Sequence, residues 1–421
     1  MSGPPLSIAF IVRDALPPIR ADLLTLFGTE MPRYGVGTEL VGQGDGGADD
    51  DKTAPPWPAG GMHVVGTLRH RFASVCSPLW DLLGLVRALR GLRLTGGRRP
   101  DCIQVRDKIA SGLACRIAAA ILGLPFVYWM SFPIVEGFEV RRDHLRGAGG
   151  GLRATLLWAA HALRARASRL VVYRWVLPGA RHIFVQSDAM AAWLEAKGLD
   201  RARMTAVPMG VDAQLFDRSR VPPAADPRLD GRRVVVYLGR IARSRSSDFL
   251  LDVADRLRAV LPAVLLVIAG DAPSTDEMAW MRREIAARGL QQHVLLTGWL
   301  PQRSALGYAV RAEVGLSPIP RGTLFDVSSP TKLVEYMALG IPSVANDIPD
   351  QQLVIAASGA GLCVPMDAGA FAAATLHILH DAGTAQAFAQ RGPPWVKSHR
   401  TYAILGRQVA DVYKKILTEP Q

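Results

Sequence analysis

Short apolar runs recur along the chain, and most are followed by a turn and then by a segment with helical spacing of its apolar residues. Such runs, bounded by Gly, Pro or charged residues, are typical of strands buried on both faces of a sheet. The strands predicted in this way are residues 6–12, 38–41, 101–105, 126–130, 183–187, 204–207, 234–238, 265–270, 294–297, 314–319, 343–345 and 359–365. Their alternation with helices predicts an α/β fold built on parallel sheets.

The helical segments fill most of the gaps between these strands. They are residues 21–34, 110–122, 188–197, 248–260, 329–340, 368–382 and 401–417. A chain of 421 residues has room for two doubly wound domains. The segment 218–232 is rich in Pro, Asp and Arg and is predicted to be the linker, which gives domains of residues 1–217 and 233–400.

The stretch 314–347 reads as strand, loop, helix and strand in succession. Ser329 is a good helix cap, and Pro330 suits the first helical position, where its missing N–H removes no hydrogen bond. Gly340 followed by Pro342 predicts the end of the helix. Because the preceding strand belongs to a parallel sheet, the helix begins at the carboxyl edge, where ligands bind in open α/β sheets. Its free N–H groups and dipole favour an anion, most often phosphate.

Two charged residues near the start of this helix, Lys332 and Glu335, are three positions apart and therefore share one side. The cation can meet a phosphate group while the carboxylate accepts hydrogen bonds from two sugar hydroxyls. By spacing alone, an ordinary surface ion pair explains the two residues equally well.

A second anion-binding loop follows the strand 234–238. It contains Gly239, Arg240, Arg243 and Arg245. The glycine allows close approach of a ligand to the backbone, and guanidinium groups recognise phosphate oxygens. The alternative is three arginines that only face solvent.

The composition, with 49% hydrophobic and 20% charged residues, is that of a globular protein. The formal net charge of +12 indicates an anionic partner such as a nucleotide, a membrane surface or a nucleic acid, or only aids solubility.

The four cysteines are scattered without a CxxC pair, which favours a reducing cytosol over disulfides or a zinc site. The sequence has neither an apolar run of 18 residues nor the pattern of a signal peptide, so we expect no spanning helix.

Residues 141–182 form the most basic segment, with nine arginines and Asp143 as the single acid, a net charge of +8. Leu and Trp residues, including Trp158 and Trp175, lie between the arginines. This mixture suits an anionic membrane surface, whereas no motif for nucleic-acid recognition is present. A solvated face over a core helix is the alternative.

Three consecutive aspartates, Asp49, Asp50 and Asp51, could indicate a metal-binding motif. They lie in the polar segment 42–61, which is rich in Gly and Pro and has the character of a loop insertion. We therefore interpret them as loop residues and expect no metal site.

Several segments resemble glycosyltransferases of family 4 (group 1), which have the GT-B fold and retain the anomeric configuration. These segments are SPTKLVEYMALGIPSVAND, FVQSDAMAAWLEAKG followed by VPMGVD, GWLPQ, IQVRDK and FVYWMSFP. The last two are similar to exopolysaccharide and capsule glycosyltransferases of this family. The resemblance implies two Rossmann-like domains that face a cleft, with a C-terminal helix, residues 401–421, that returns to the N-terminal domain.

The resemblance also implies roles for residues of the C-terminal domain. Arg240, Arg245 and Lys332 would stabilise the leaving diphosphate and are the candidate catalytic residues. Glu335 would bind the ribose. Residues predicted to complete the donor site are Gly239, Arg243, Gly298, Trp299, Leu300, Ser329, Pro330 and Thr331. No metal or other cofactor is implied.

On the acceptor side the candidates are Arg13, Arg20, Arg106 and Ser131, which follow predicted strands of the N-terminal domain. The sequence departs from the family at two places. Many members carry a histidine near Ser131, and many have a second glutamate where this chain has Val327, next to Asp326.

We therefore predict a hexosyltransferase that moves a sugar, with retention, from a nucleoside-diphosphate sugar to a lipid-linked glycan in the synthesis of bacterial exopolysaccharide, capsule or a related surface polysaccharide. It would be cytoplasmic and peripheral on the inner face of the cell membrane, held there by residues 141–182. A nucleotide-sugar 2-epimerase of the same fold and a non-catalytic nucleotide-sugar-binding partner are the alternatives. An epimerase would need acid and base carboxylates and no membrane face.

Overall fold

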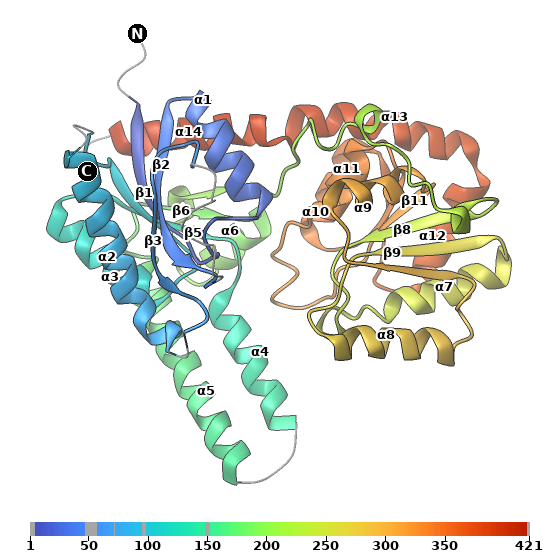
Figure 1. The fold of residues 1–421 in the computed structure, drawn as a ribbon, viewed down its shortest axis with the longest axis horizontal. Coiled ribbons are helices and arrows are strands. Elements are labelled where there is room, and N and C mark those ends of the chain that lie inside the picture. Colours follow the sequence, from blue (N-terminus) through green and yellow to red (C-terminus); the bar gives the residue numbers. More distant parts are fainter. Residues whose placement is uncertain (1–4, 47–56, 71, 95–97, 148–151, 419–421) are drawn as a thin grey trace. The chain divides into compact units, whose positions relative to one another are not determined.

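The computed structural model describes residues 5–46, 57–70, 72–94, 98–147 and 152–418 (Figure 1). The aspartates 49–51 lie outside the described residues. The chain forms two compact units, here called the first unit (Met1–Pro208 with Tyr402–Gln421) and the second unit (Met209–Thr401). Each unit consists of a parallel sheet with helices packed against it.

The first unit contains a seven-stranded sheet in the order β3-β2-β1-β4-β5-β6-β7, and every strand pair in it is parallel. Its strands are β1 (Leu6–Ile11), β2 (Val36–Gly44), β3 (Met62–Thr67), β4 (Cys102–Arg106), β5 (Phe126–Met130), β6 (His182–Val185) and β7 (Met204–Ala206). The chain order reverses between β1 and β4, which is the kind of position where doubly wound sheets bind ligands.

The helices of the first unit lie between these strands in the sequence, except for α14, which follows the second unit. They are η1 (Asp22–Glu30), α1 (Met31–Arg33), α2 (Ala73–Leu94), α3 (Ala110–Leu122), α4 (Ile134–Gly147), α5 (Leu152–Leu170), η2 (Val171–Val176), α6 (Asp188–Glu195), η3 (Arg201–Arg203) and α14 (Tyr402–Thr418). Helices α4 and α5 pack against each other and project from the sheet as a hairpin (Figure 1).

Helix α14 comes from the far end of the sequence and completes the core of the first unit. Its residues Tyr402, Leu405, Val409 and Tyr413 are buried together with residues from β1, β5 and β6. The rings of Tyr413 and Phe184 lie 5.0 Å apart. The helix therefore belongs to the first unit although the whole second unit precedes it in the sequence.

The second unit contains a six-stranded parallel sheet in the order β10-β9-β8-β11-β12-β13. Its strands are β8 (Arg233–Leu238), β9 (Val264–Ala269), β10 (Val294–Gly298), β11 (Val314–Ser317), β12 (Ser343–Asn346) and β13 (Gly361–Val364). Its helices are η4 (Arg218–Arg220), η5 (Pro227–Leu229), η6 (Arg243–Arg245), α7 (Phe249–Val260), α8 (Thr275–Ala287), α9 (Gln302–Val310), α10 (Thr331–Ala338), α11 (Pro349–Ser358), α12 (Ala368–His380) and α13 (Ala382–His399).

The predicted fold class, two Rossmann-like α/β domains, is confirmed. The segment predicted as a linker, residues 218–232, lies in the second unit, as do residues 209–217. Arg218 fixes the segment because it donates hydrogen bonds to the carbonyls of Val310 (2.8 Å) and Leu339 (3.2 Å). Among the described helices, none combines the length and the apolar character needed to cross a bilayer.

Candidate active site

The predicted donor residues of the second unit follow the carboxyl ends of three strands of one sheet, β8, β10 and β11. Gly239 follows β8, Gly298 ends β10, and the loop after β11 leads to α10. Because the sheet is parallel, these ends lie at one edge. Helix α10 buries Leu333, Val334, Tyr336 and Met337 in the core, so Lys332 and Glu335 are left half-buried on its other side.

A hydrogen bond ties α10 to the end of β8. The backbone N–H of Leu238 donates to the hydroxyl of Tyr336 at 2.7 Å. One turn earlier on the helix, the Lys332 ammonium lies 5.0 Å from the ring centre of Tyr237. The structure thus brings Lys332 to the loop that begins at Gly239.

A residue with a side chain would not fit at position 239, because of both the backbone conformation and the space that Lys332 occupies. Gly239 has a φ of +151°, a region that side-chain-bearing residues rarely adopt. A Cβ added there would lie 2.6 Å from Cε of Lys332. The glycine leaves the space that the lysine side chain occupies.

The three arginines after Gly239 differ in their surroundings. The guanidinium of Arg243 forms an ion pair with Glu277 (3.4 Å) and lies over the ring of Trp280 at 4.6 Å. Arg240 and Arg245 are exposed, and neither forms a side-chain hydrogen bond or ion pair with another described residue. Arg240 and Arg245 therefore remain available for an anion, whereas Arg243 holds the loop to α8.

Glu335 is half-buried, with Lys332 and Thr331 beside it. Burial raises the pKa of this carboxyl above its ordinary value, while the charge of Lys332 and a hydrogen bond from Thr331 act in the opposite direction. A half-buried carboxylate beside a lysine is suited to accept hydrogen bonds from ligand hydroxyls that replace its lost water.

The predicted cap of α10 is not formed by Ser329. Pro330 occupies the N-cap position, and no side chain caps the helix. The hydroxyl of Ser329 instead donates to Asp350 (2.8 Å) and accepts from the backbone N–H of Met209 (3.0 Å). Arg400 completes this buried group through a 2.7 Å hydrogen bond to Asp350. Ser329 therefore positions the loop, and the N–H groups at the start of α10 have no side-chain cap.

A second buried network, missed in the sequence, fixes the loop after β11. The Asn346 amide accepts from the N–H of Ile319 at 2.7 Å and donates to its carbonyl at 2.9 Å. Gln351 donates to Asn346 Oδ1 at 3.1 Å and accepts from Ser317. Asn346 and Gln351 lie near apolar residues in the sequence. Because buried amides are normally fully hydrogen-bonded, this context could have indicated the network.

The loop at the end of β10 contains three of the predicted donor residues, Gly298, Trp299 and Leu300. Gly298 has φ +70°, and Trp299 is 72% exposed. Leu300 is half-buried. The loop also pairs with Gly270, next to the end of β9.

Val327 and Asp326 lie in the loop before α10. Val327 is buried, and Asp326 forms a 2.8 Å ion pair with Arg321. Asp326 is thus engaged within its own loop.

The acceptor-side candidates of the first unit are linked by two carboxylates. Asp22 pairs with Arg20 (3.0 Å) and with the fully buried Arg106 (2.5 Å). Burial alone would raise the pKa of Asp22, but Arg106 and Arg20 together hold it at about 2. Arg20 and Arg106 are therefore held together by a carboxylate that is ionised at neutral pH.

Asp107, which follows β4, holds Ser131. The Ser131 N–H donates to Asp107 at 2.9 Å, and its hydroxyl donates to the other carboxylate oxygen. Asp107 has φ +52°, an uncommon conformation for a residue with a side chain. Its pKa is raised by burial, against the opposing charges of Arg106 and Arg13. Arg13 itself is exposed.

A buried lysine lies next to this group. Lys108 donates to both oxygens of Asp81 at 2.8 Å and to the Gln43 amide at 2.7 Å. This network could not be predicted from sequence spacing, because Asp81 and Gln43 are 27 and 65 positions from Lys108. Burial lowers the pKa of Lys108.

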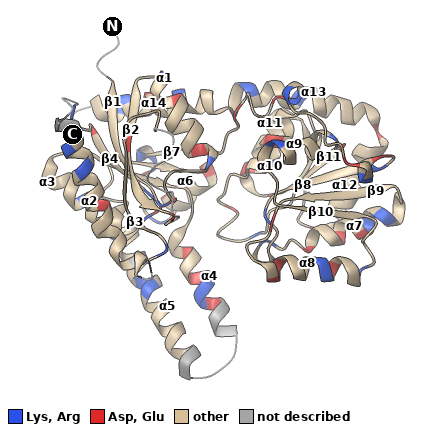
Figure 2. Ribbon diagram, viewed as in Figure 1, with Lys and Arg blue, Asp and Glu red and all other residues tan. Residues whose placement is uncertain are grey.

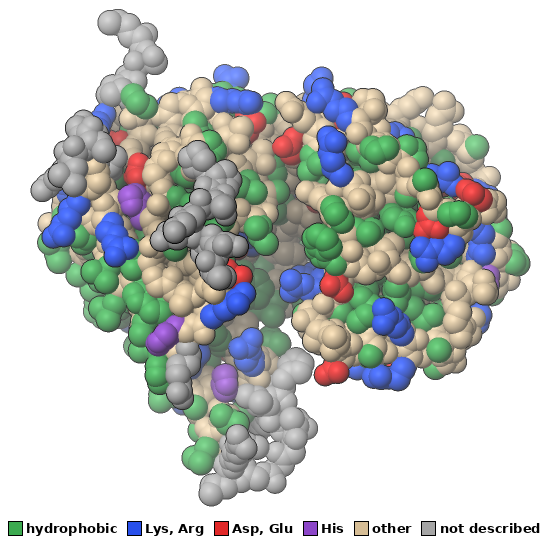
Figure 3. Space-filling model, in the orientation of Figure 1, with side chains coloured by type: hydrophobic (Ala, Val, Ile, Leu, Met, Phe, Trp, Pro, Cys, Tyr) green, Lys and Arg blue, Asp and Glu red, His purple; other side chains and the backbone are tan. Residues whose placement is uncertain are grey.

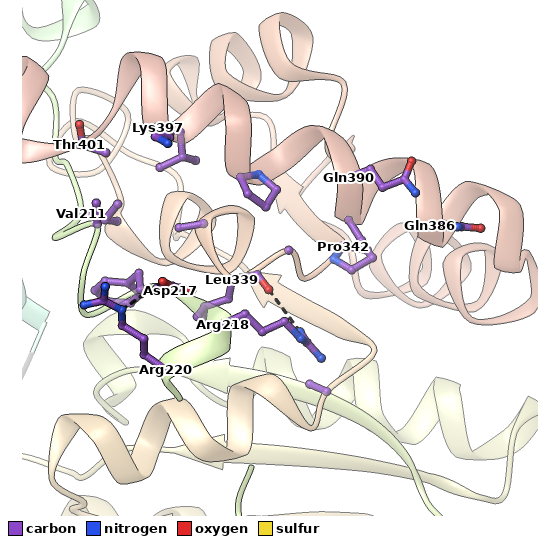
Figure 4. Close-up of a pocket in the computed structure, with 18 of the residues that line it drawn as sticks. Val211, Asp217, Arg218, Arg220, Leu339, Pro342, Gln386, Gln390, Lys397 and Thr401 are labelled. Atoms are coloured by element: carbon purple, nitrogen blue, oxygen red, sulfur yellow. Dashed lines mark hydrogen bonds and ion pairs between the residues drawn. The ribbon is translucent and has the colours of Figure 1, made fainter. Parts of the chain in front are cut away.

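A cavity of about 900 Å³ lies elsewhere in the second unit (Figure 4). It is lined by residues that precede β11 and β12, such as Glu313 and Pro342, and by the end of α10. These positions are at the amino edge of the sheet, opposite the edge that carries Lys332. None of the predicted donor residues lines this cavity.

Comparison with known families identifies the family of this chain. The profile of the glycosyl transferase 4-like domain matches residues 27–210, and that of glycosyl transferases group 1 matches residues 232–381. The chain belongs to the group 1 glycosyltransferases.

Curated relatives of this group 1 chain include two sugar transferases. Alpha-D-kanosaminyltransferase from Streptomyces kanamyceticus is 26% identical over 45% of this chain and 47% of its own length. Phosphatidyl-myo-inositol mannosyltransferase from Mycolicibacterium smegmatis is 29% identical over 55% of this chain and 56% of its own length. The chain thus matches about half the length of these relatives.

Solved structures establish that this group 1 chain has the GT-B fold. Sucrose-phosphate synthase from Thermosynechococcus elongatus superposes with a TM-score of 0.70 at 18% identity, over 98% of this chain and 99% of that one. Anabaena HepE in complex with UDP superposes with a TM-score of 0.66 at 15% identity, over 97% of this chain and 100% of that one.

Proposed function

We propose that the chain is a retaining hexosyltransferase that moves a sugar from a nucleoside-diphosphate sugar to a lipid-linked glycan. The observation that carries the proposal is the meeting of Lys332, Gly239 and Glu335 at the carboxyl edge of the second sheet. The ammonium of Lys332 beside the Gly239 loop suits the diphosphate of a nucleotide. The carboxylate of Glu335, about one helical turn away, suits the ribose of the same nucleotide.

The group that departs in this reaction is a nucleoside diphosphate. The bond between the anomeric carbon and the phosphate oxygen breaks, and a bond to the acceptor oxygen forms. Arg240, Arg245 and Lys332 would stabilise the negative charge that develops on the diphosphate. The acceptor proton would pass to a phosphate oxygen of the leaving group, so no protein base is needed. This step follows from the family resemblance.

The acceptor is assigned to the first unit, at the edge that carries Asp107 and Ser131. Nη1 of Arg106 is buried without a hydrogen-bond partner among the described residues, and Nε has no hydrogen bond there but lies 3.7 Å from Asp107 in an ion pair. A buried, partly unpaired guanidinium next to a positive-φ residue is typical of a functional site. The mannosyltransferase relative, whose name refers to a phosphatidyl lipid, supports a lipid-linked acceptor.

We further propose that the protein is peripheral on the inner face of the cell membrane and acts in surface-polysaccharide synthesis. The basic segment 141–182 supports membrane attachment. It covers the end of α4, all of α5 and η2 (Figure 2). Of the seven arginines whose side chains the structure describes in this segment, five are exposed. Arg181 is an exception, because its Nε donates to the Ile416 carbonyl of α14.

One experiment separates the proposal from its alternatives. The protein is incubated with a panel of nucleotide sugars, with and without lipid extract as acceptor, and released nucleoside diphosphate is measured. Acceptor-stimulated release supports the transferase. Conversion of the sugar without release supports a 2-epimerase, and nucleotide binding without either product supports a non-catalytic partner.

A further inference from the structure

Large exposed hydrophobic side chains are concentrated in the first unit. Of nineteen such side chains in the described residues, sixteen belong to the first unit and three to the second. Figure 3 shows hydrophobic side chains gathered at the lower left of the view, over α2. Scattered exposed apolar residues are normal, but an uneven concentration of this kind marks an interaction surface.

Helix α2 carries the main part of this surface. Val75, Leu79, Leu83 and Val86, here called the α2 stripe, recur at intervals of four, four and three residues and therefore share one face. Val75 is 73% exposed and Leu79 65% exposed. The opposite face of α2 buries Leu85 and Ala88 on the sheet, so the helix is apolar on both sides. A helix that only covered its own sheet would be polar on the outer side.

Neighbouring elements extend the α2 stripe. Helix α3 packs against α2 and exposes Ile117 (52%) and Ile121 (80%). The segment η2 packs against α3 and exposes Trp175 (55%). An indole at the edge of an apolar surface is the arrangement found where proteins meet lipid headgroups.

The charged residues of these elements are almost all arginines. Together α2, α3, α5 and η2 contain nine arginines and one acid, Asp81. The arginines are Arg87, Arg90, Arg93, Arg116, Arg153, Arg164, Arg166, Arg169 and Arg174. Asp81 is fully buried and neutralised by Lys108. These four elements therefore offer cations and apolar side chains. The neighbouring acids of α4, Glu139 and Asp143, are paired with Arg169 and Arg142.

We propose that the α2 stripe, with Ile117 and Ile121 of α3 and Trp175 of η2, inserts into the headgroup region of an anionic bilayer. A protein partner would usually meet charges of both signs at a polar rim, whereas the charged residues of these elements are almost all arginines. This inference rests on the proposed function, which already makes the membrane a partner of the protein. It adds a second means of attachment, the insertion of apolar side chains of α2, to the charges of residues 141–182.

The test is co-sedimentation with vesicles of phosphatidylcholine containing about one third phosphatidylglycerol, an amount sufficient for polybasic attraction. The parent protein should bind, and part of the binding should survive high salt, because apolar insertion is not screened. The double variant Leu79→Ser with Leu83→Ser should bind at least about tenfold more weakly, since two apolar side chains no longer enter the bilayer.

The matched control is Val260→Ser with Leu353→Ser, which removes two exposed apolar side chains from the second unit. It should bind like the parent. A second test variant, Ile117→Ser with Ile121→Ser, lies on another helix and guards against a folding defect in α2. Binding of both test variants at the parent level would overturn the proposal, as would size-exclusion data showing that the stripe only joins two copies of the chain.

This assay contains no nucleotide sugar, so its result is independent of catalysis. Loss of vesicle binding with unchanged nucleoside diphosphate release supports the membrane surface. Failure of every nucleotide sugar to react would refute the proposed function and leave the vesicle result standing.

Discussion

The ammonium of Lys332 lies 5.0 Å from the ring centre of Tyr237, in the space that a side chain at position 239 would fill. The cation is held over the ring face, which attracts positive charge. Both residues flank the loop that carries Arg240 and Arg245. The arrangement keeps a positive charge at the carboxyl edge of the sheet before any ligand arrives.

Gly239→Ala should displace Lys332 and lower turnover about a hundredfold, because the new Cβ would lie 2.6 Å from Cε of the lysine and small displacements of a catalytic group are costly. The measurement is the rate of nucleoside diphosphate release. Gly231→Ala is the matched control, since Gly231 also has a positive φ (+70°) but nothing lies within 4 Å of its Cβ position. Equal rates in the two variants would refute the steric argument.

Arg245→Ala and Lys332→Ala should each lower turnover at least about a hundredfold, because each removes a preorganised charge from the leaving group. Arg243→Ala should have a smaller effect on turnover and a lower melting temperature, since its guanidinium is engaged with Glu277 and Trp280. Single-turnover kinetics and thermal melts separate the two effects. If Arg243→Ala proved the most damaging to turnover, the division of roles within the loop would be wrong.

Glu335→Ala should weaken nucleotide binding by about 1–3 kcal/mol, because the ribose hydroxyls lose their acceptor. Titration calorimetry with the free nucleoside diphosphate measures this loss directly. An unchanged affinity in a folded variant would remove Glu335 from the site.

Glu335→Gln should have a pH-dependent effect on stability. Burial raises the pKa of Glu335 in the folded state, so the folded protein binds this proton more tightly than the unfolded chain does. The resulting stabilisation is fully present below the unfolded pKa and is lost as pH rises through the folded pKa. The glutamine variant should therefore be more stable than the parent at neutral pH, and the difference should vanish in acid. Denaturant melts at several pH values check this, and a difference that grew in acid would contradict it.

Charge reversal in residues 141–182 should reduce vesicle binding at low salt. Arg169 pairs with Glu139 at 2.6 Å and Arg164 lies over the Phe138 ring at 4.5 Å, so reversing either would also disturb the α4–α5 contact. Arg166→Glu with Arg174→Glu avoids this problem. Each arginine near the surface contributes about 1 kcal/mol, so binding should fall by about tenfold or more.

The control for that variant is Arg282→Glu with Arg283→Glu, an equal change of charge at exposed positions of the second unit. It should leave vesicle binding near the parent value. Similar losses in both pairs would mean that net charge, and not this segment, governs binding.

Prolonged dialysis against a chelator should leave the release of nucleoside diphosphate unchanged, because the leaving group is assigned to arginine, lysine and a helix start. The rate is measured before and after dialysis, with and without added Mg²⁺. A loss of activity restored by Mg²⁺ would show that a cation shares this role.

Much of the strand pattern, and the place in the sheet of the loops proposed to bind the donor, could be predicted, because buried parallel strands are continuous apolar runs and their carboxyl ends meet at one edge. What could not be predicted depends on partners distant in the sequence. Ser329 was expected to cap α10, but Asp350 and Arg400 engage its hydroxyl. Arg106 was expected at a strand end, yet its burial depends on Asp22, 84 positions earlier.

Helix α2 was missed for a different reason. Its apolar residues point to both sides, so the segment lacks the one-sided pattern by which surface helices are recognised. The same feature that hid the helix in the sequence makes its outer face a candidate membrane surface.

The position of α14 has a consequence for the order in which the chain can fold during synthesis. The second unit is one continuous segment, Met209–Thr401, and can become compact as soon as it has been made. The first unit cannot, because Phe184 and the other core residues that α14 covers stay open until Tyr402–Thr418 emerge. Domains usually complete their folding in the order of their synthesis. In this protein the unit that is begun first is completed last.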